Sequence, residues 1–296
     1  MDRSTFPGAP VALVVTGALF AAAAAGLSLS GSTALVVACG AILSFGLPHG
    51  ALDIELIRNQ GTGGHGFVAV VTLYLAIVAV TATAWLFAPV TALAGFIVIA
   101  VFHFADDWKM VQSRFLSTGL GVALIAAPTL LHRDAVADIF IVLTGDPSAA
   151  GLASALFFVA PMSLAIAVAG IAVMIETPRF DAASAAAASL IGLVALPPIA
   201  GFAVFFCLFH SPRHFIEALA KAKRWRVERW MPVVLPVTLA AGAIVTAIFV
   251  FHGAPTIPER VTAATFMALA ILTVPHMLAP LAFRLLIPSA EPLVSD

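Results

Sequence analysis

The sequence predicts an all-α protein, a polytopic bundle of about eight to ten transmembrane helices. Hydrophobic residues make up 62% of the 296 residues and charged residues only 10%, and the mean hydropathy is +1.10. Soluble domains are typically about one quarter charged. Runs of roughly 20 apolar residues between short polar breaks are typical of membrane-spanning helices. The period-two alternation of lipid-facing strands is absent from the sequence.

Each predicted span is an apolar run between polar, proline or glycine breaks. The first run resembles a secretory signal, but Asp2 offsets Arg3 in its leader and the run is long for a signal core, so we read it as a span. The stretch 184–220 is too long for one span, and Pro197 and Pro198 divide it because proline breaks a helix. If the short pieces are re-entrant, the spans number eight. The ten predicted segments are 9–28, 33–57, 67–88, 90–108, 116–131, 152–174, 184–196, 199–220, 231–251 and 261–285.

The basic residues of the short loops predict the orientation, because Lys and Arg are enriched on the cytoplasmic side of membrane proteins. With a cytoplasmic N-terminus and ten alternating spans, eleven of the 14 basic residues lie inside, Arg133 and Arg260 lie outside, and Arg213 lies within a span. We therefore expect a multi-pass protein of the cell (inner) membrane. No linker or internal repeat divides the chain, so residues 1–296 are expected to form one domain.

Nucleic acid is not an expected partner, because the net charge is −1 and the chain has no basic tail. Cys39 and Cys207 both lie in apolar runs. We expect them to be small buried hydrophobic residues rather than a disulfide.

Histidines are the most informative polar residues of the predicted spans. All five embedded histidines fall in spans predicted to run from outside to inside, about one to three helical turns before the cytoplasmic end, and therefore at one depth. A single embedded histidine is more often a structural residue at a helix interface. Several buried imidazoles are costly unless each has a partner, and one metal ion can serve them all. The five are His49, His103, His210, His214 and His276.

The spacing of these histidines adds to the prediction of a metal site. His210 and His214 are four residues apart on one helix, so both rings can face one ion, and Pro212 between them would loosen that helix. Acidic residues follow the histidines by about one turn. Metal-bound histidines usually donate their second N–H to a carboxylate or carbonyl, although solvation at a helix end explains Asp106 and Asp107 equally well. The candidate acids are Asp53, Asp106, Asp107 and Glu217.

Phenylalanines cluster near the histidines in the sequence. Any one of them is best explained by packing or lipid contact, but together they predict an apolar channel that admits a lipid-soluble substrate and excludes water. An all-imidazole site in such a channel suits iron, copper or zinc. The candidate channel residues are Phe45, Phe102, Phe104, Phe206, Phe209 and Phe215.

Three motifs resemble those of a known family. "GLPHGALD", "FHFADDW" and "FHSPRHF", in this order, are similar to motifs of the Brp/Blh family of β-carotene 15,15′-dioxygenases, and the resemblance extends from about residue 33 to 285. It implies an integral-membrane enzyme that uses Fe(2+) and O₂ to cleave the central double bond of β-carotene, or of a close carotenoid, into two molecules of retinal. The four metal ligands that it implies are His49, His103, His210 and His214.

The resemblance leaves some points open. His276 matches no position of the family pattern and remains a candidate for an additional site residue. The family's product implies a functional link to a rhodopsin through retinal, although no feature of this chain indicates such a partner. Membrane lipid is the expected surrounding medium.

Other functions of the buried histidines remain as alternatives. Two imidazoles on facing helices could hold the haem of a membrane electron carrier. Buried His/Asp pairs could relay protons in a proton-coupled transporter, although no inverted repeat supports one. A two-iron desaturase needs several HxxxH and HxxHH clusters, whereas this chain has a single HxxxH pair.

Overall fold

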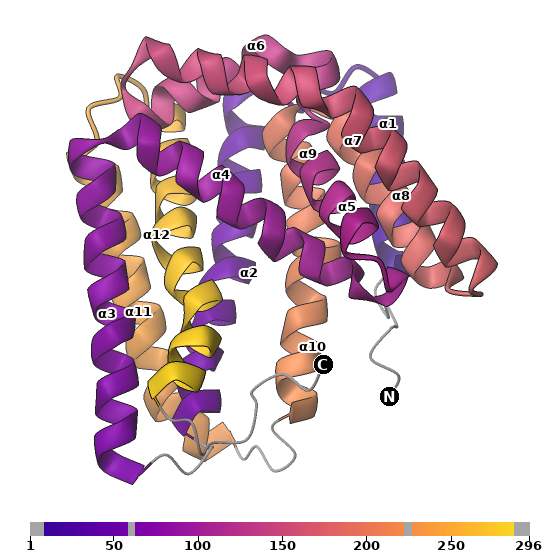
Figure 1. Ribbon diagram of the computed structural model, residues 1–296. Coiled ribbons are helices and arrows are strands. Elements are labelled where there is room, and N and C mark those ends of the chain that lie inside the picture. Colours follow the sequence, from indigo (N-terminus) through magenta and orange to yellow (C-terminus); the bar gives the residue numbers. More distant parts are fainter. Residues whose placement is uncertain (1–8, 59–62, 222–226, 287–296) are drawn as a thin grey trace.

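The computed structural model describes residues 9–58, 63–221 and 227–286, and these ranges contain helices and no strand (Figure 1). The all-α prediction is therefore confirmed. In chain order the elements are α1 (Ala9–Ala24), α2 (Ser32–Arg58), α3 (Gly63–Phe87), α4 (Pro89–Ala105), η1 (Asp106–Val111), α5 (Arg114–Ala126), α6 (Thr129–Thr144), η2 (Pro147–Ala149), α7 (Ala150–Glu176), α8 (Phe180–Ala195), α9 (Pro198–Phe205), η3 (Phe206–His210), α10 (Ser211–Lys221), α11 (Val227–Phe251) and α12 (Ile257–Leu286).

The helices of the described ranges are those of a membrane protein. Four segments are long and apolar enough to cross a membrane: Pro89–Val111, Pro147–Glu176, Pro198–Glu217 and Ile257–Leu278. A fifth is added if α5 and α6, which meet at 63°, count as one broken span. Five shorter apolar helices accompany them. Each of the ten predicted segments overlaps a helix, although 9–28 extends past α1 and 116–131 crosses the break between α5 and α6. Of the described helices, four or five, rather than eight to ten, are long and apolar enough to be spans. The orientation of the N-terminus stays a prediction.

The predicted break at the proline pair is present. Helix α8 ends at Ala195, Leu196 is extended, with φ −86° and ψ 156°, and α9 begins at Pro198. A residue before proline is driven out of the helical conformation by the proline ring. The helix that carries His210 therefore starts independently of α8.

Most of helix α6 lies outside the predicted spans, because residues 132–151 do not form a continuous apolar run. Arg133, Asp134 and Asp138 interrupt the apolar run. The helix lies across one end of the bundle (Figure 1), where it exposes these charges on one face and buries Val136 and Leu143 on the other. Such a two-faced helix does not need a continuous apolar run.

Glycines allow α5 to pack closely between two neighbours. A Cβ atom on Gly121 would overlap the carbonyl oxygen of Val101 on α4, and one on Gly119 would overlap Ile166 on α7. Small residues let transmembrane helices approach closely. This packing fixes the position of α4, whose end carries His103.

Candidate metal centre

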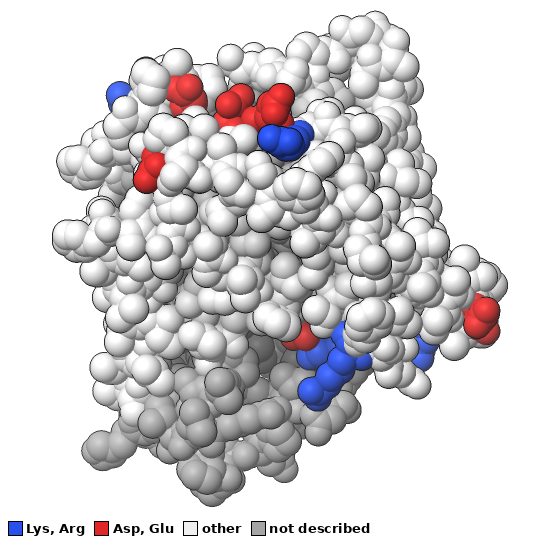
Figure 2. Space-filling view, turned by 45° about the horizontal axis from the view of Figure 1, so that its top comes forward, with Lys and Arg blue, Asp and Glu red and all other residues white. Residues whose placement is uncertain are grey.

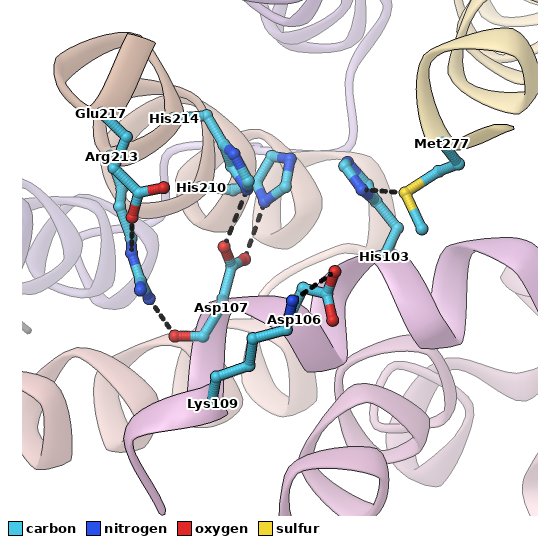
Figure 3. A network of polar contacts seen from close by, with 9 residues as sticks. All are labelled: His103, Asp106, Asp107, Lys109, His210, Arg213, His214, Glu217 and Met277. Atoms are coloured by element: carbon cyan, nitrogen blue, oxygen red, sulfur yellow. Dashed lines mark hydrogen bonds and ion pairs between the residues drawn. The ribbon is translucent and has the colours of Figure 1, made fainter. Parts of the chain in front are cut away.

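Three parts of the chain bring polar side chains together inside the bundle (Figure 3). His103 is the third-last residue of α4, and Asp107 follows in η1. His210 ends η3, and His214 lies in α10. His276 and Met277 belong to α12.

One carboxylate serves two of these histidines. Asp107 lies 2.7 Å from Nδ1 of His210 through Oδ2 and 3.0 Å from Nε2 of His214 through Oδ1. The side chains of His210 and Asp107 are 0% and 2% exposed, so this contact is shielded from water. Because a carboxylate accepts hydrogen bonds at both oxygens, it directs the second ring nitrogen of each histidine away from itself.

The imidazole rings form a compact group. The centroid of the His103 ring lies 4.7 Å from that of His210, 5.6 Å from that of His214 and 5.3 Å from that of His276. The rings of His210 and His214 are 4.6 Å apart. In addition, Nδ1 of His103 lies 2.8 Å from Sδ of Met277. Four of the five predicted histidines therefore meet at one level.

A π-helical turn sets the direction of His210. The turn η3 spans Phe206–His210 and leads into α10, where Pro212 is the second residue. Proline cannot donate to the carbonyl four residues earlier and its ring crowds that carbonyl, and a widened turn relieves both problems. Ser211 donates a 2.9 Å hydrogen bond to the carbonyl oxygen of Phe45, which ties α2 to this turn four residues before His49.

The predicted acidic partners lie differently from the expectation. Asp107 contacts histidines of another helix instead of supporting His103 on its own. Asp106 forms a 3.1 Å ion pair with Lys109 at the surface, which agrees with the alternative of helix-end solvation. Glu217, expected beside His214, accepts a 2.9 Å hydrogen bond from Nε of Arg213.

Arg213 is a further site residue that the sequence analysis did not identify. Its guanidinium donates through Nη1 to the carbonyl oxygen of Asp107, and Glu217 holds it from the next turn. The sequence offered two signals: Arg213 falls within a predicted span, and it precedes Glu217 by four residues, a pair that is common on helices. His49 and Asp53 belong to α2, but their side chains lie outside the described residues.

An apolar cavity of ≈170 Å³ reaches the histidine cluster. His103, His210 and His276 line it, whereas His214 is not among the described lining residues. Of the six predicted channel residues, Phe104 and Phe206 line this cavity. The other four are not among its described lining residues: Phe45, Phe102 and Phe215 have exposed side chains, and Phe209 is buried in the core. Sequence proximity to a histidine does not fix the face of the helix on which a side chain lies.

The cavity extends from the histidines toward α6. Leu93 and His103 both line it from α4, and Phe266 and His276 both line it from α12. Each pair is ten residues apart, which corresponds to about 15 Å along a helix. Val136, Ile139, Phe140 and Leu143 of α6 line the other end.

The donor set fits a metal ion. Asp107, His210 and His214 place possible ligand atoms within 4.8 Å of one another, and the ring of His103 lies beside them. Imidazole and carboxylate ligands suit iron, and also zinc and copper.

Comparisons with known proteins agree with this site. Residues 40–280 match the family described as β-carotene 15,15′-dioxygenase. A β-carotene 15,15′-dioxygenase of an uncultured marine bacterium, 66A03, is 27% identical over 80% of this chain and 89% of its own length. A probable β-carotene 15,15′-dioxygenase, Blh, of Halobacterium salinarum is 27% identical over 85% of each chain. No solved structure shows a significant match. Because the family match covers well over half of the chain, the chain belongs to the β-carotene 15,15′-dioxygenase family.

Proposed function

We propose that this protein is an iron-dependent dioxygenase of the cell (inner) membrane that cleaves the central 15,15′ double bond of β-carotene, or of a close carotenoid, into two molecules of retinal. The proposal rests on one observation: an apolar cavity reaches a buried cluster of histidines and an aspartate. The family membership and the names of the two relatives support the same reaction.

His103, His210 and His214, together with His49, would hold Fe(II). Asp107 accepts hydrogen bonds from His210 and His214, which leaves Nε2 of the first and Nδ1 of the second to face an ion. Met277 contacts the Nδ1 atom of His103 and would leave its Nε2 atom for the same purpose. Bound Fe(II) would supply the activation of O₂.

The cavity would position the substrate. Its walls are almost entirely hydrocarbon, so they take up a polyene from the surrounding lipid and keep water away from the reacting bond. The two atoms of O₂ replace one carbon–carbon double bond by two carbonyl groups, so no proton has to be transferred. This balance agrees with the scarcity of acids and bases among the lining residues. Retinal released into the membrane would be available to a rhodopsin.

The test is to replace His210 by Ala and measure bound iron and retinal together. Detergent-purified protein is loaded with Fe(II) under nitrogen, given β-carotene and then exposed to air, and the products are separated by chromatography. We expect the unchanged protein to give retinal as its sole product and the His210→Ala variant to lose both iron and product. The matched control is His252→Ala, because His252 lies at the end of α11 and its Nδ1 accepts only a local bond from the amide of Ala254.

Two results would contradict the proposal. Full cleavage by the His210→Ala variant would exclude His210 as a ligand. Failure of the unchanged protein to cleave β-carotene or a related carotenoid, with iron confirmed to be bound, would exclude the reaction.

A further inference from the structure

We infer that α6 forms the end wall of the cavity and that Phe140 determines how far a polyene enters, and thereby which double bond reaches the histidines. The inference rests on the proposed function, and it adds a specificity-determining residue that lies far from the metal centre.

The packing of α6 makes it suitable as a wall. Leu143, which is 4% exposed, packs in one buried cluster with Leu93 of α4 and Ile271 of α12. Val136 is similarly buried. The helix also lies across the ends of the neighbouring helices (Figure 1), so its position is fixed from several sides.

Two helices, α4 and α12, give the same depth for the cavity. From the histidine cluster to the α6 end, α4 and α12 each advance ten residues, or about 15 Å. Ile139 of α6 and Phe266, the α12 residue at that end, pack against the same buried clusters. A polyene that enters past the histidines therefore has a definite distance to travel before it meets α6.

Shape alone can stop the polyene at this wall. The described lining residues near α6 are Leu93, Val136, Ile139, Phe140, Leu143 and Phe266, and none has a side chain that forms hydrogen bonds. A hydrocarbon end group offers none either. The register of the polyene at the metal centre must therefore come from steric contact, as in other positioning effects on reactivity.

Phe140 is the appropriate residue to change. It is the largest α6 side chain on the cavity, and it is partly exposed, whereas Val136 and Leu143 are buried. Removing its ring would deepen the cavity at less cost to folding than a change at either of the other two. A deeper cavity lets the polyene slide further in, so the bond at the histidines would be displaced from the centre.

The first experiment follows the cleavage products. The iron-loaded Phe140→Ala variant is given β-carotene and O₂, and we expect cleavage displaced by one conjugated double bond, with a longer and a shorter carbonyl product in place of retinal alone. Ile139→Phe makes the cavity shallower and should also displace cleavage from the central bond. Because β-carotene is symmetric, displacement in either sense gives the same pair of products, and the limiting chain length measured below distinguishes the two variants. The control is Phe158→Ala, a deletion of the same ring at a site on α7 that is 79% exposed, which should give only retinal.

A second measurement separates this inference from the proposed function. Metal-free protein is titrated under nitrogen with apocarotenals of increasing chain length, and binding is followed by tryptophan fluorescence. Affinity should rise with length until the chain fills the cavity and then level off, at a longer chain for Phe140→Ala and at a shorter one for Ile139→Phe.

The outcomes are distinct. A limiting length that is the same in all variants, or unchanged products from Phe140→Ala, would overturn the role of α6. If the limiting length moves but the unchanged protein forms no retinal, the end wall is supported and the proposed reaction is wrong.

Discussion

Asp107 illustrates how one side chain can organise a centre made of several helices. Its two oxygens contact His210 and His214, and its own carbonyl oxygen accepts from Arg213. Arg213 is in turn held by Glu217. A buried carboxylate is costly unless it is paired and fully hydrogen-bonded, so this arrangement is best explained by the need to orient the two rings.

We predict that Asp107→Asn weakens Fe(II) binding by about 10- to 100-fold, because partners of metal-bound histidines typically contribute that much to affinity. The amide can accept through only one of its two polar atoms, so one ring loses its acceptor. Fe(II) titration of the purified protein measures the effect. The control is Asp106→Asn, one residue away but paired with Lys109 at the surface. Equal affinity in the two variants would rule out the orienting role.

The histidines and Asp107 could be proposed as site residues from the sequence, but the pairings between them could not. An embedded imidazole is unusual in a membrane helix, so it can be recognised as a candidate from the sequence alone. The pairing of Asp107 with His210 spans 103 residues of sequence, and it depends on how α4 packs against η3. Spacing within one helix suggested Glu217 for His214, whereas Arg213 is the residue that Glu217 contacts.

For the helices too, features set by the local sequence could be predicted, whereas features that depend on tertiary packing could not. The break at Pro197–Pro198 follows from local backbone chemistry and was predicted correctly. Helix α6 lies outside the apolar runs, because a helix across the end of the bundle exposes one face to polar surroundings. Pro212 predicts that the helix is disturbed but not the form of the disturbance, so the π-helical turn at Phe206–His210 could not be predicted.

The packing of α5 against α4 gives a prediction at this scale. A Cβ atom on Gly121 would overlap the backbone of α4 at Val101, two residues before His103. We expect Gly121→Ala to destabilise the protein by about 1–3 kcal/mol, as overpacking typically does, and to reduce iron retention by displacing α4.

The thermal unfolding midpoint in detergent and the bound iron measure these two effects. Gly95→Ala is the matched control, because Gly95 lies in α4, the helix that Gly121 contacts, and a Cβ atom there would meet nothing within 4 Å. A midpoint for Gly121→Ala as high as that of Gly95→Ala would show that α4 and α5 can separate without cost.

For the whole molecule, the distribution of charge indicates how it lies in the membrane. On the face seen in Figure 2, charged side chains form two bands with a broad uncharged belt between them. Helix α6, with Arg133, Asp134 and Asp138, lies across one end of the bundle, whereas Lys109 and Arg179 follow α4 and α7, which lead away from α6. An uncharged belt between charged ends is what a lipid bilayer requires.

If the N-terminus is cytoplasmic, as the distribution of Lys and Arg predicts, α6 would lie on the outside of the membrane. Helix α7 tests this directly, because Ser148 precedes it, Thr177 follows it, and both residues are exposed. We expect a membrane-impermeant maleimide to label Ser148→Cys in intact cells and Thr177→Cys only after permeabilisation. The natural thiols should stay unlabelled, because Cys39 and Cys207 are buried.

Labelling in the reverse pattern would invert the orientation, and labelling of both from one side would show that α7 does not cross. The expected pattern would put the α6 wall near the outer surface and the histidine cluster nearer the cytoplasm, so a polyene would reach the site along the bilayer normal.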